Sequence, residues 1–236
     1  MLKQKKQPFV ISLKDYLRPM QQKTWKWNLA QSIELRWWKN YLQNKNPAEY
    51  LIWKKEYWNN LLAQINDLKF ENICEVLDCG CGPAGVFIVL PENISVDAED
   101  PLLNEYENTL PHFKKAMYPN VKFHAVAFED FTTEKKYDVV FCMNAINHVS
   151  DLDLCYDKLS SLLKPNGKLI ITIDAHNHQF FKQLFRLIPG DVLHPHQFDL
   201  KDYEQLLTKR GLKILQTEKL KQEFFFNHYL QVAQKQ

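Results

Sequence analysis

The sequence predicts an α/β fold, a doubly wound seven-stranded sheet preceded by an N-terminal helical extension. Three observations support this prediction. From residue 73 onward, short apolar runs alternate with segments of helical character, which is the pattern of parallel strands joined by helices. A glycine-rich turn from Gly80 to Gly85 follows the first run. Two further runs, 212–216 and 225–232, have the spacing of a closing antiparallel pair.

The N-terminal segment is predicted to be helical, and residues 1–70 form the first of two predicted domains. All six tryptophans lie there. Two helical stripes of apolar side chains are present: Leu29, Ile33, Trp37 and Tyr41, then Tyr50, Trp53, Tyr57, Leu61 and Ile65. Asn46 and Pro47 provide a cap and a first-turn proline for the second helix. The two helices either complete the hydrophobic core or form an aromatic roof over a ligand site.

The second predicted domain, residues 71–236, contains the sheet. After the strand that ends at Asp78, further strands are expected at 94–97, 121–126, 137–142 and 168–173. Helices are expected over 101–117 with a possible break at Pro111, over 150–163, over 177–187 and from Asp199 to about Arg210, where Gly211 ends the last one. Only a short helix of about two turns fits between Gly85 and Asp97.

The glycine-rich turn is the strongest functional signal in the chain. Gly80, Gly82 and Gly85 follow the first apolar run, and glycine allows both a sharp turn and the close approach of a ligand. Asp97 closes the next apolar run, nineteen residues after Asp78. An acid at about this distance commonly binds ribose hydroxyls in nucleotide-binding α/β units. The pattern therefore predicts a site for an adenosine-bearing ligand.

Asp78 distinguishes between two classes of such ligands. In dinucleotide-binding folds a pyrophosphate lies against the glycine turn, and a carboxylate two residues before Gly80 would repel it. The same carboxylate suits a ligand that carries an ammonium group. Asp78 therefore disfavours a NAD-dependent oxidoreductase, which stays open as an alternative.

These residues resemble the first motif of the class I S-adenosylmethionine-dependent methyltransferases. Three later segments continue the resemblance, in the same order as in that family: Phe128–Asp130, Asn144–Ser150 and Leu162–Gly167. The resemblance covers residues 73–236 and implies the strand order 3-2-1-4-5-7-6 with the last strand antiparallel. It also implies that the chain is an enzyme that transfers a methyl group from S-adenosyl-L-methionine.

The resemblance assigns cofactor-binding roles to particular positions. Asp78 would bind the ammonium group, Asp97 the ribose hydroxyls, and Glu129 or Asp130 the adenine edge. The carbonyl of Asn144 would lie beside the sulfonium. The full predicted cofactor set is Asp78, Gly80, Cys81, Gly82, Asp97, Ala98, Phe128, Glu129 and Asn144.

Two histidines are candidates for a general base, because histidine titrates near neutral pH. His148 follows the fourth predicted strand, and His196 lies in the loop after the fifth. The alternatives are a packing role for His148 and a pocket-lining role for His196. His176 and His178 form a second pair, but no spacing brings them to the pair His194 and His196, so no metal site is predicted.

Composition narrows the class of acceptor. The net charge is +2 and no basic arm is present, which disfavours nucleic acid and favours a small-molecule acceptor. No apolar run approaches 18 residues, so no membrane partner is expected. The lysine-bearing N-terminus has no apolar block of signal-peptide length, which predicts a cytoplasmic location. Five cysteines, an odd number, are expected as reduced thiols. A non-catalytic module that only binds S-adenosylmethionine remains the second alternative.

Overall fold

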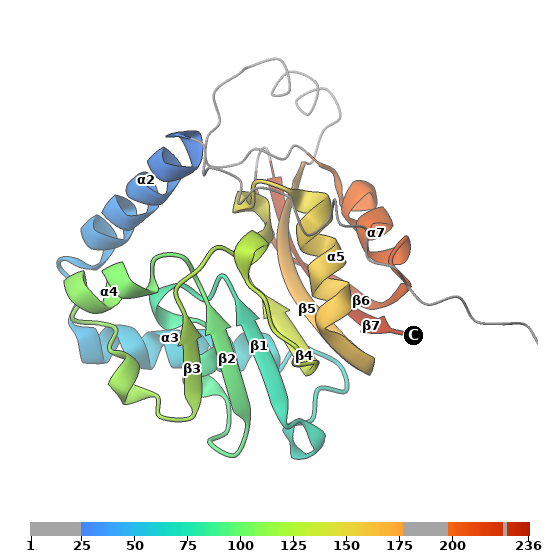
Figure 1. Ribbon diagram of the computed structural model, residues 1–236, viewed down its shortest axis with the longest axis horizontal. Coiled ribbons are helices and arrows are strands. Elements are labelled where there is room, and N and C mark those ends of the chain that lie inside the picture. Colours follow the sequence, from blue (N-terminus) through green and yellow to red (C-terminus); the bar gives the residue numbers. More distant parts are fainter. Residues whose placement is uncertain (1–24, 177–197, 224–225) are drawn as a thin grey trace, which may run out of the picture.

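The computed structural model describes residues 25–176, 198–223 and 226–236. Its centre is a seven-stranded sheet in the order β3-β2-β1-β4-β5-β7-β6, as the sequence predicts (Figure 1). The strands are β1 (Glu75–Cys79), β2 (Ser95–Glu99), β3 (Val121–His124), β4 (Tyr137–Cys142), β5 (Leu163–His176), β6 (Leu212–Gln222) and β7 (Phe226–Lys235). β1 to β5 are parallel to one another, whereas β7 is antiparallel to both β5 and β6.

Helices cover both faces of the sheet. The α-helices are α2 (Trp25–Leu42), α3 (Pro47–Leu62), α4 (Leu103–Thr109), α5 (Leu152–Leu162) and α7 (Leu200–Thr208). In Figure 1, α3 passes behind the strands and α5 lies in front of them. Each face of the sheet has its own hydrophobic core. Because side chains alternate along a strand, Val76 of β1 packs in the core on the side of α3, whereas Leu77 packs in the core on the side of α5.

Local sequence signals account for several helix boundaries. The Asn46 side chain accepts hydrogen bonds from the first turn of α3, as predicted. Asp199 and Asp202 form a reciprocal capping box at α7. For α5 we expected Ser150 to open the helix, but the Asp151 carboxylate caps it by accepting from the Leu154 amide. Asn166 has a left-handed backbone with φ of 63°, which asparagine tolerates well.

The segment after β1 differs from the expected short helix. It forms two 3-10 turns, η2 (Gly82–Ala84) and η3 (Val86–Val89). Gly80 and Gly82 both have φ of 59°, and Pro83 stands at the start of η2. With so few residues before β2, the chain crosses back to the sheet without completing an α-helical turn. The helix predicted over 101–117 is also shorter: α4 covers only Leu103–Thr109, and η4 (Lys115–Met117) follows it.

The two N-terminal helices have different environments. α3 belongs to the core, where Trp58 is 4% exposed and its indole N–H donates to the Ala84 carbonyl at 2.9 Å. The stripe predicted for α2 is exposed instead, with Trp37 54% exposed and Leu29 41% exposed. α2 instead packs Leu35 and Trp38 against the core and places Gln31 and Glu34 at a cavity. α3 shares a core with β1, and the division of the chain at residue 70 stays a prediction.

Two further predictions concern the cysteines and membrane-spanning segments. All five cysteines carry free thiols. Within the described part of the chain, no helix is both long and apolar enough to cross a membrane. The helix predicted over 177–187 and the histidines 178, 194 and 196 lie outside the described residues.

Candidate functional site

A cavity lies at the carboxyl ends of β1, β2 and β4, where open α/β sheets bind ligands. Its floor is formed by Cys79, Gly80 and Cys142, and α2 closes one side with Trp27 and Gln31. The other residues that line it are Glu34, Glu99, Asp100, Pro101, Ala127, Phe128, Glu129, Asn144, Ala145, His148 and Val149. Of the nine predicted cofactor residues, four therefore reach the cavity wall: Gly80, Phe128, Glu129 and Asn144.

Glu99 is the last residue of β2 and is fully buried in this cavity. One carboxyl oxygen, Oε2, accepts a long hydrogen bond of 3.4 Å from the Gly80 amide. The other oxygen, Oε1, has no hydrogen-bond partner. Burial, followed by repulsion from Asp100, raises the pKa of Glu99 well above its usual range. A buried acceptor without a donor is costly, and a ligand hydroxyl at this position would satisfy it.

Two more carboxyl groups stand beside Glu99. Asp100 accepts from the amides of Gly82 and Leu102 at 3.0 and 2.8 Å, and burial and the charge of Glu34 raise its pKa to about 7. Burial also raises the pKa of Glu34, an effect that His148 partly opposes. Among the described residues that line the cavity, His148 is the only basic side chain. The cavity thus favours a ligand with positive charge.

Gly80 and Asn144 bring the turns after β1 and β4 together. A Cβ atom on Gly80 would lie 2.3 Å from the Ala145 Cβ, so no other residue fits without displacing this loop. Asn144 has φ of 56°. Its amide donates to the Thr172 hydroxyl at 2.8 Å, and that hydroxyl donates back to the Asn144 side chain at 2.9 Å. These bonds fix a strained turn at the cavity edge.

The opposite wall is formed by η5 (Phe128–Asp130). The Lys158 ammonium, on α5, donates to the carbonyls of Phe128, Glu129 and Phe131. The Glu129 carboxylate accepts from the Ser150 amide at 2.6 Å. α5 therefore holds η5 in place, and the Phe128 ring provides an apolar surface suited to an aromatic base.

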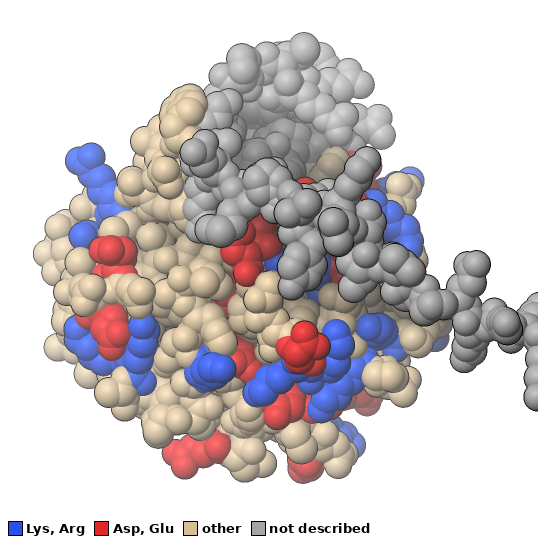
Figure 2. Space-filling model, in the orientation of Figure 1, with Lys and Arg blue, Asp and Glu red and all other residues tan. Residues whose placement is uncertain are grey.

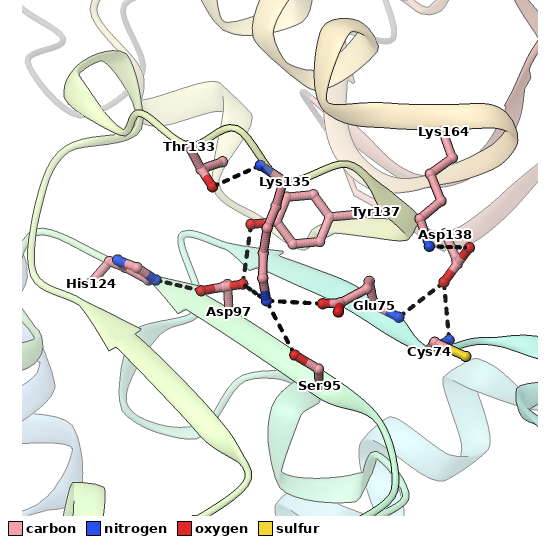
Figure 3. Close-up of polar contacts among 10 residues, drawn as sticks. All are labelled: Cys74, Glu75, Ser95, Asp97, His124, Thr133, Lys135, Tyr137, Asp138 and Lys164. Carbon is pink, nitrogen blue, oxygen red and sulfur yellow. Dashed lines mark hydrogen bonds and ion pairs between the residues drawn. The ribbon is translucent and has the colours of Figure 1, made fainter.

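Asp97 does not line this cavity, so the geometry of the site lends no support to its predicted ribose-binding role. Its carboxylate accepts from Lys135 at 3.0 Å and from Tyr137 at 3.2 Å, and lies 2.6 Å from the His124 ring (Figure 3). Burial alone would raise the pKa of Asp97, but the bonds from His124 and Lys135 outweigh it and lower the pKa. The β-sheet register pairs Cys79 with Glu99, so Glu99, two residues further along, reaches the carboxyl edge instead.

Four other predicted cofactor residues do not line the cavity either. The Asp78 carboxylate points away toward η3, where it accepts from the Phe87 amide at 3.0 Å, and burial raises its pKa to about 7. The side chains of Cys81 and Ala98 are buried in the core on the side of α3. Gly82 lies under Trp38, whose ring would be 3.5 Å from an added Cβ.

Of the two histidines predicted as general bases, the structure describes only His148. His148, on η6 (Ile146–His148), lines the cavity opposite Glu34. His196 lies outside the described residues. Among those that are described, no three histidine, cysteine or carboxylate side chains are grouped to hold a metal ion.

Comparison with known proteins identifies the family. Residues 71–225 match the model of a family described as a methyltransferase domain. The chain belongs to this family. The match, together with the strand order, confirms the resemblance to the class I S-adenosylmethionine-dependent methyltransferases.

Two curated relatives are both named ubiquinone biosynthesis O-methyltransferase. The Rickettsia akari protein is 31% identical over 139 residues, which cover 51% of this chain and 53% of the relative. The Rickettsia prowazekii protein is 29% identical over 171 residues, which cover 66% of each. The chain thus spans between half and two thirds of the length of these relatives.

A solved structure shares the fold at lower identity. A putative S-adenosylmethionine-dependent methyltransferase from Listeria monocytogenes has a TM-score of 0.61 and 21% identity, and the likeness covers 78% of this chain and 98% of that one. At this identity the likeness supports the fold.

Proposed function

We propose that this protein binds S-adenosyl-L-methionine in the cavity and transfers its methyl group to a hydroxyl oxygen of a small molecule. The observation that carries the proposal is Glu99, a buried acid at the end of β2 with one oxygen lacking a donor. The two ribose hydroxyls of an adenosine ligand are donors of the required kind. The choice of oxygen follows the names of the Rickettsia relatives.

The surrounding residues support the same ligand. Glu34 and Asp100 would attract the ammonium and sulfonium charges, and Phe128 would contact the adenine ring. S-adenosylmethionine supplies a methyl group that is already activated by its sulfonium, so the protein mainly needs to orient the two partners. Gly80 lets the turn after β1 and the Ala145 loop approach each other at the cavity wall, where the methionyl part would bind.

The cavity is unsuited to a pyrophosphate, which argues against a NAD-dependent oxidoreductase. Dinucleotide folds place the pyrophosphate at the N-terminus of an α-helix. Here two 3-10 turns follow β1, and the Phe87 amide already donates to Asp78. Glu34, Glu99 and Asp100 would add charge repulsion.

A small acceptor fits the surface better than nucleic acid does. On the face drawn in Figure 2, basic and acidic residues are interspersed, whereas nucleic-acid sites gather basic residues. A cytoplasmic location stays a prediction from the sequence, as does the division of the chain at residue 70.

Calorimetric titration with S-adenosylhomocysteine and with NAD tests the proposed ligand. We expect S-adenosylhomocysteine to bind and NAD not to bind. Tighter binding of NAD would contradict the proposal. A screen for methyl transfer to phenol, amine and thiol acceptors would then separate an enzyme from a module that only binds the ligand.

A pair of glycine variants tests the location of the site. Gly80→Ala and Gly211→Ala both place a side chain at positive φ, which costs roughly 1–2 kcal/mol of stability. Only the Gly80 variant also meets Ala145, at the cavity, whereas Gly211 has open space around it. We expect Gly80→Ala to weaken S-adenosylhomocysteine binding and Gly211→Ala to preserve it. Equal affinities in the two variants would place the ligand elsewhere.

A further inference from the structure

A second cavity, of about 390 Å³, lies next to the first one and shares Asn144 with it. It is lined by Asn144, Asn147, Asp174, Lys221, Glu223, Phe226 and His228. These residues come from the turn after β4, the end of β5 and the β6–β7 hairpin. A molecule in this cavity would therefore reach the proposed methyl donor across Asn144.

The second cavity contains a paired histidine and aspartate. The Nδ1 atom of His228 lies 2.8 Å from the Asp174 carboxylate, and the β5–β7 register places the two residues directly opposite each other. An ionised carboxylate only accepts hydrogen bonds, so Nδ1 donates to Asp174, and in the neutral ring Nε2 presents a lone pair. Within the part of the chain that the structure describes, the contact with Asp174 is the only polar contact of the His228 ring.

Neighbouring residues hold this pair in position. The Asn147 side-chain amide donates to the Asp174 carbonyl at 3.1 Å and to the Tyr203 hydroxyl at 2.9 Å, and its oxygen accepts from the Asp174 amide at 3.3 Å. The His228 side chain is 18% exposed and that of Asp174 is 42% exposed. His228 is thus oriented but remains accessible. Phe226 adds an apolar surface to the cavity that suits an aromatic acceptor.

We infer that His228 is the general base for the acceptor hydroxyl and that Asp174 is its positioning residue. This inference rests on the proposed function. The O–H bond of the acceptor breaks, and its proton bonds to Nε2 of His228. The electron pair left on oxygen forms the new bond to the methyl carbon, while the pair of the carbon–sulfur bond returns to sulfur. The imidazolium then releases its proton to water.

His228 suits this role better than His148 does. His148 lines the cofactor cavity, where it faces Glu34. His228 lies in the neighbouring cavity and is oriented through its other ring nitrogen, which is the arrangement that sets the tautomer of a catalytic histidine.

The test compares His228→Gln with His124→Gln. His124 forms a similar pair with Asp97, at 2.6 Å, and its side chain is 22% exposed, but it lines neither cavity. Catechol serves as the acceptor, because it is a small aromatic with hydroxyl groups. We expect His228→Gln to lower kcat by about 10²- to 10⁴-fold, with S-adenosylhomocysteine affinity unchanged. His124→Gln should keep kcat, and Asp174→Asn should lower it less than His228→Gln does.

Nitrogen NMR of labelled histidine gives a readout that does not depend on activity. In the complex with S-adenosylhomocysteine, His228 should carry its proton on Nδ1, and catechol should shift the Nε2 resonance. Asp174→Asn should change the balance of tautomers. A proton on Nε2 in the wild type, no shift with catechol, or an unchanged kcat in His228→Gln would overturn the inference. Failure of the wild type to bind S-adenosylhomocysteine would instead contradict the proposed function.

Discussion

Asp97 and Glu99 lie two residues apart on the same face of β2, yet the protein gives them opposite surroundings. Asp97 is bonded to Lys135 and Tyr137 and lies against His124, and its pKa is lowered. Glu99 has a weak bond to Gly80 and an oxygen without a donor, and its pKa is raised.

This difference separates a structural acid from a ligand-binding one. A carboxylate whose oxygens are already satisfied by cationic and hydroxyl donors stabilises the fold and has little left to offer a ligand. A carboxylate buried without donors destabilises the fold until a ligand provides them. On this account the Asp97 cluster, which Figure 3 shows with Lys135 also bridging to Glu75 and Ser95, holds the strands together. At the end of the same strand, Glu99 has an oxygen that a ligand could bind.

The largest effect on stability is expected from Asp97→Asn. Removing the charge leaves His124 without its anion and Lys135 with only Glu75, and a hydrogen bond to a charged group contributes roughly 1.5–3 kcal/mol. For a chain of this size, we expect the melting temperature to fall by about 3–12 °C. Asp153→Asn is the control, because Asp153 also pairs with two basic residues but has a side chain that is 68% exposed. Equal, small shifts in both variants would show that the Asp97 cluster does not hold the fold.

A smaller and pH-dependent effect is expected from Glu99→Gln. Burial raises the pKa of Asp78 and of Asp100 to about 7, and it raises that of Glu99 as well. An acid with a raised pKa in the folded state adds stability at low pH, and that contribution is lost as the pH rises through the folded-state pKa. The stability of the wild type without ligand should therefore fall between pH 5 and 8.

Glu99→Gln removes one of these contributions. Its denaturant midpoint should decline less with pH than that of the wild type. Glu92→Gln, at an exposed position, should follow the wild type. Parallel curves for the wild type and Glu99→Gln would contradict the view that Glu99 is buried without compensation.

The smallest effect is expected from Glu34→Gln. Glu34 reaches the cavity from α2 and lies near Asp100, so it would add to the attraction for a cationic ligand. We expect roughly two- to fivefold weaker binding of S-adenosylmethionine, and a smaller loss for S-adenosylhomocysteine, which lacks the sulfonium charge. Glu56→Gln, on the exposed side of α3, should change neither. The same loss for both ligands would mean that Glu34 acts through packing instead.

The strand order was predictable through the family that the motifs resemble, whereas several caps were predictable because each depends on local chemistry. Asn46 before Pro47 and the pair Asp199 and Asp202 are short-range signals. The choice between Asp97 and Glu99 was not predictable in this way. Both acids follow the same apolar run, and only the pairing of β2 with β1 shows which one reaches the edge of the sheet.

Two further features depend on distant residues. The apolar stripe on α2 fits a core-facing helix by spacing, but that stripe is exposed, and Leu35 and Trp38 on another side of α2 pack against the core instead. His228 lies 54 residues from Asp174, and a histidine within a predicted strand gave no signal of a base.

The most direct test of the central claim is calorimetric titration of S-adenosylhomocysteine into Glu99→Gln and Asp97→Asn, side by side, at a temperature where both are folded. Loss of a hydrogen bond to a charged group should weaken binding to Glu99→Gln by about 10- to 150-fold. Binding to Asp97→Asn should stay within about threefold of the wild type. A loss confined to Asp97→Asn, with Glu99→Gln unchanged, would return the ribose site to Asp97 and contradict the account.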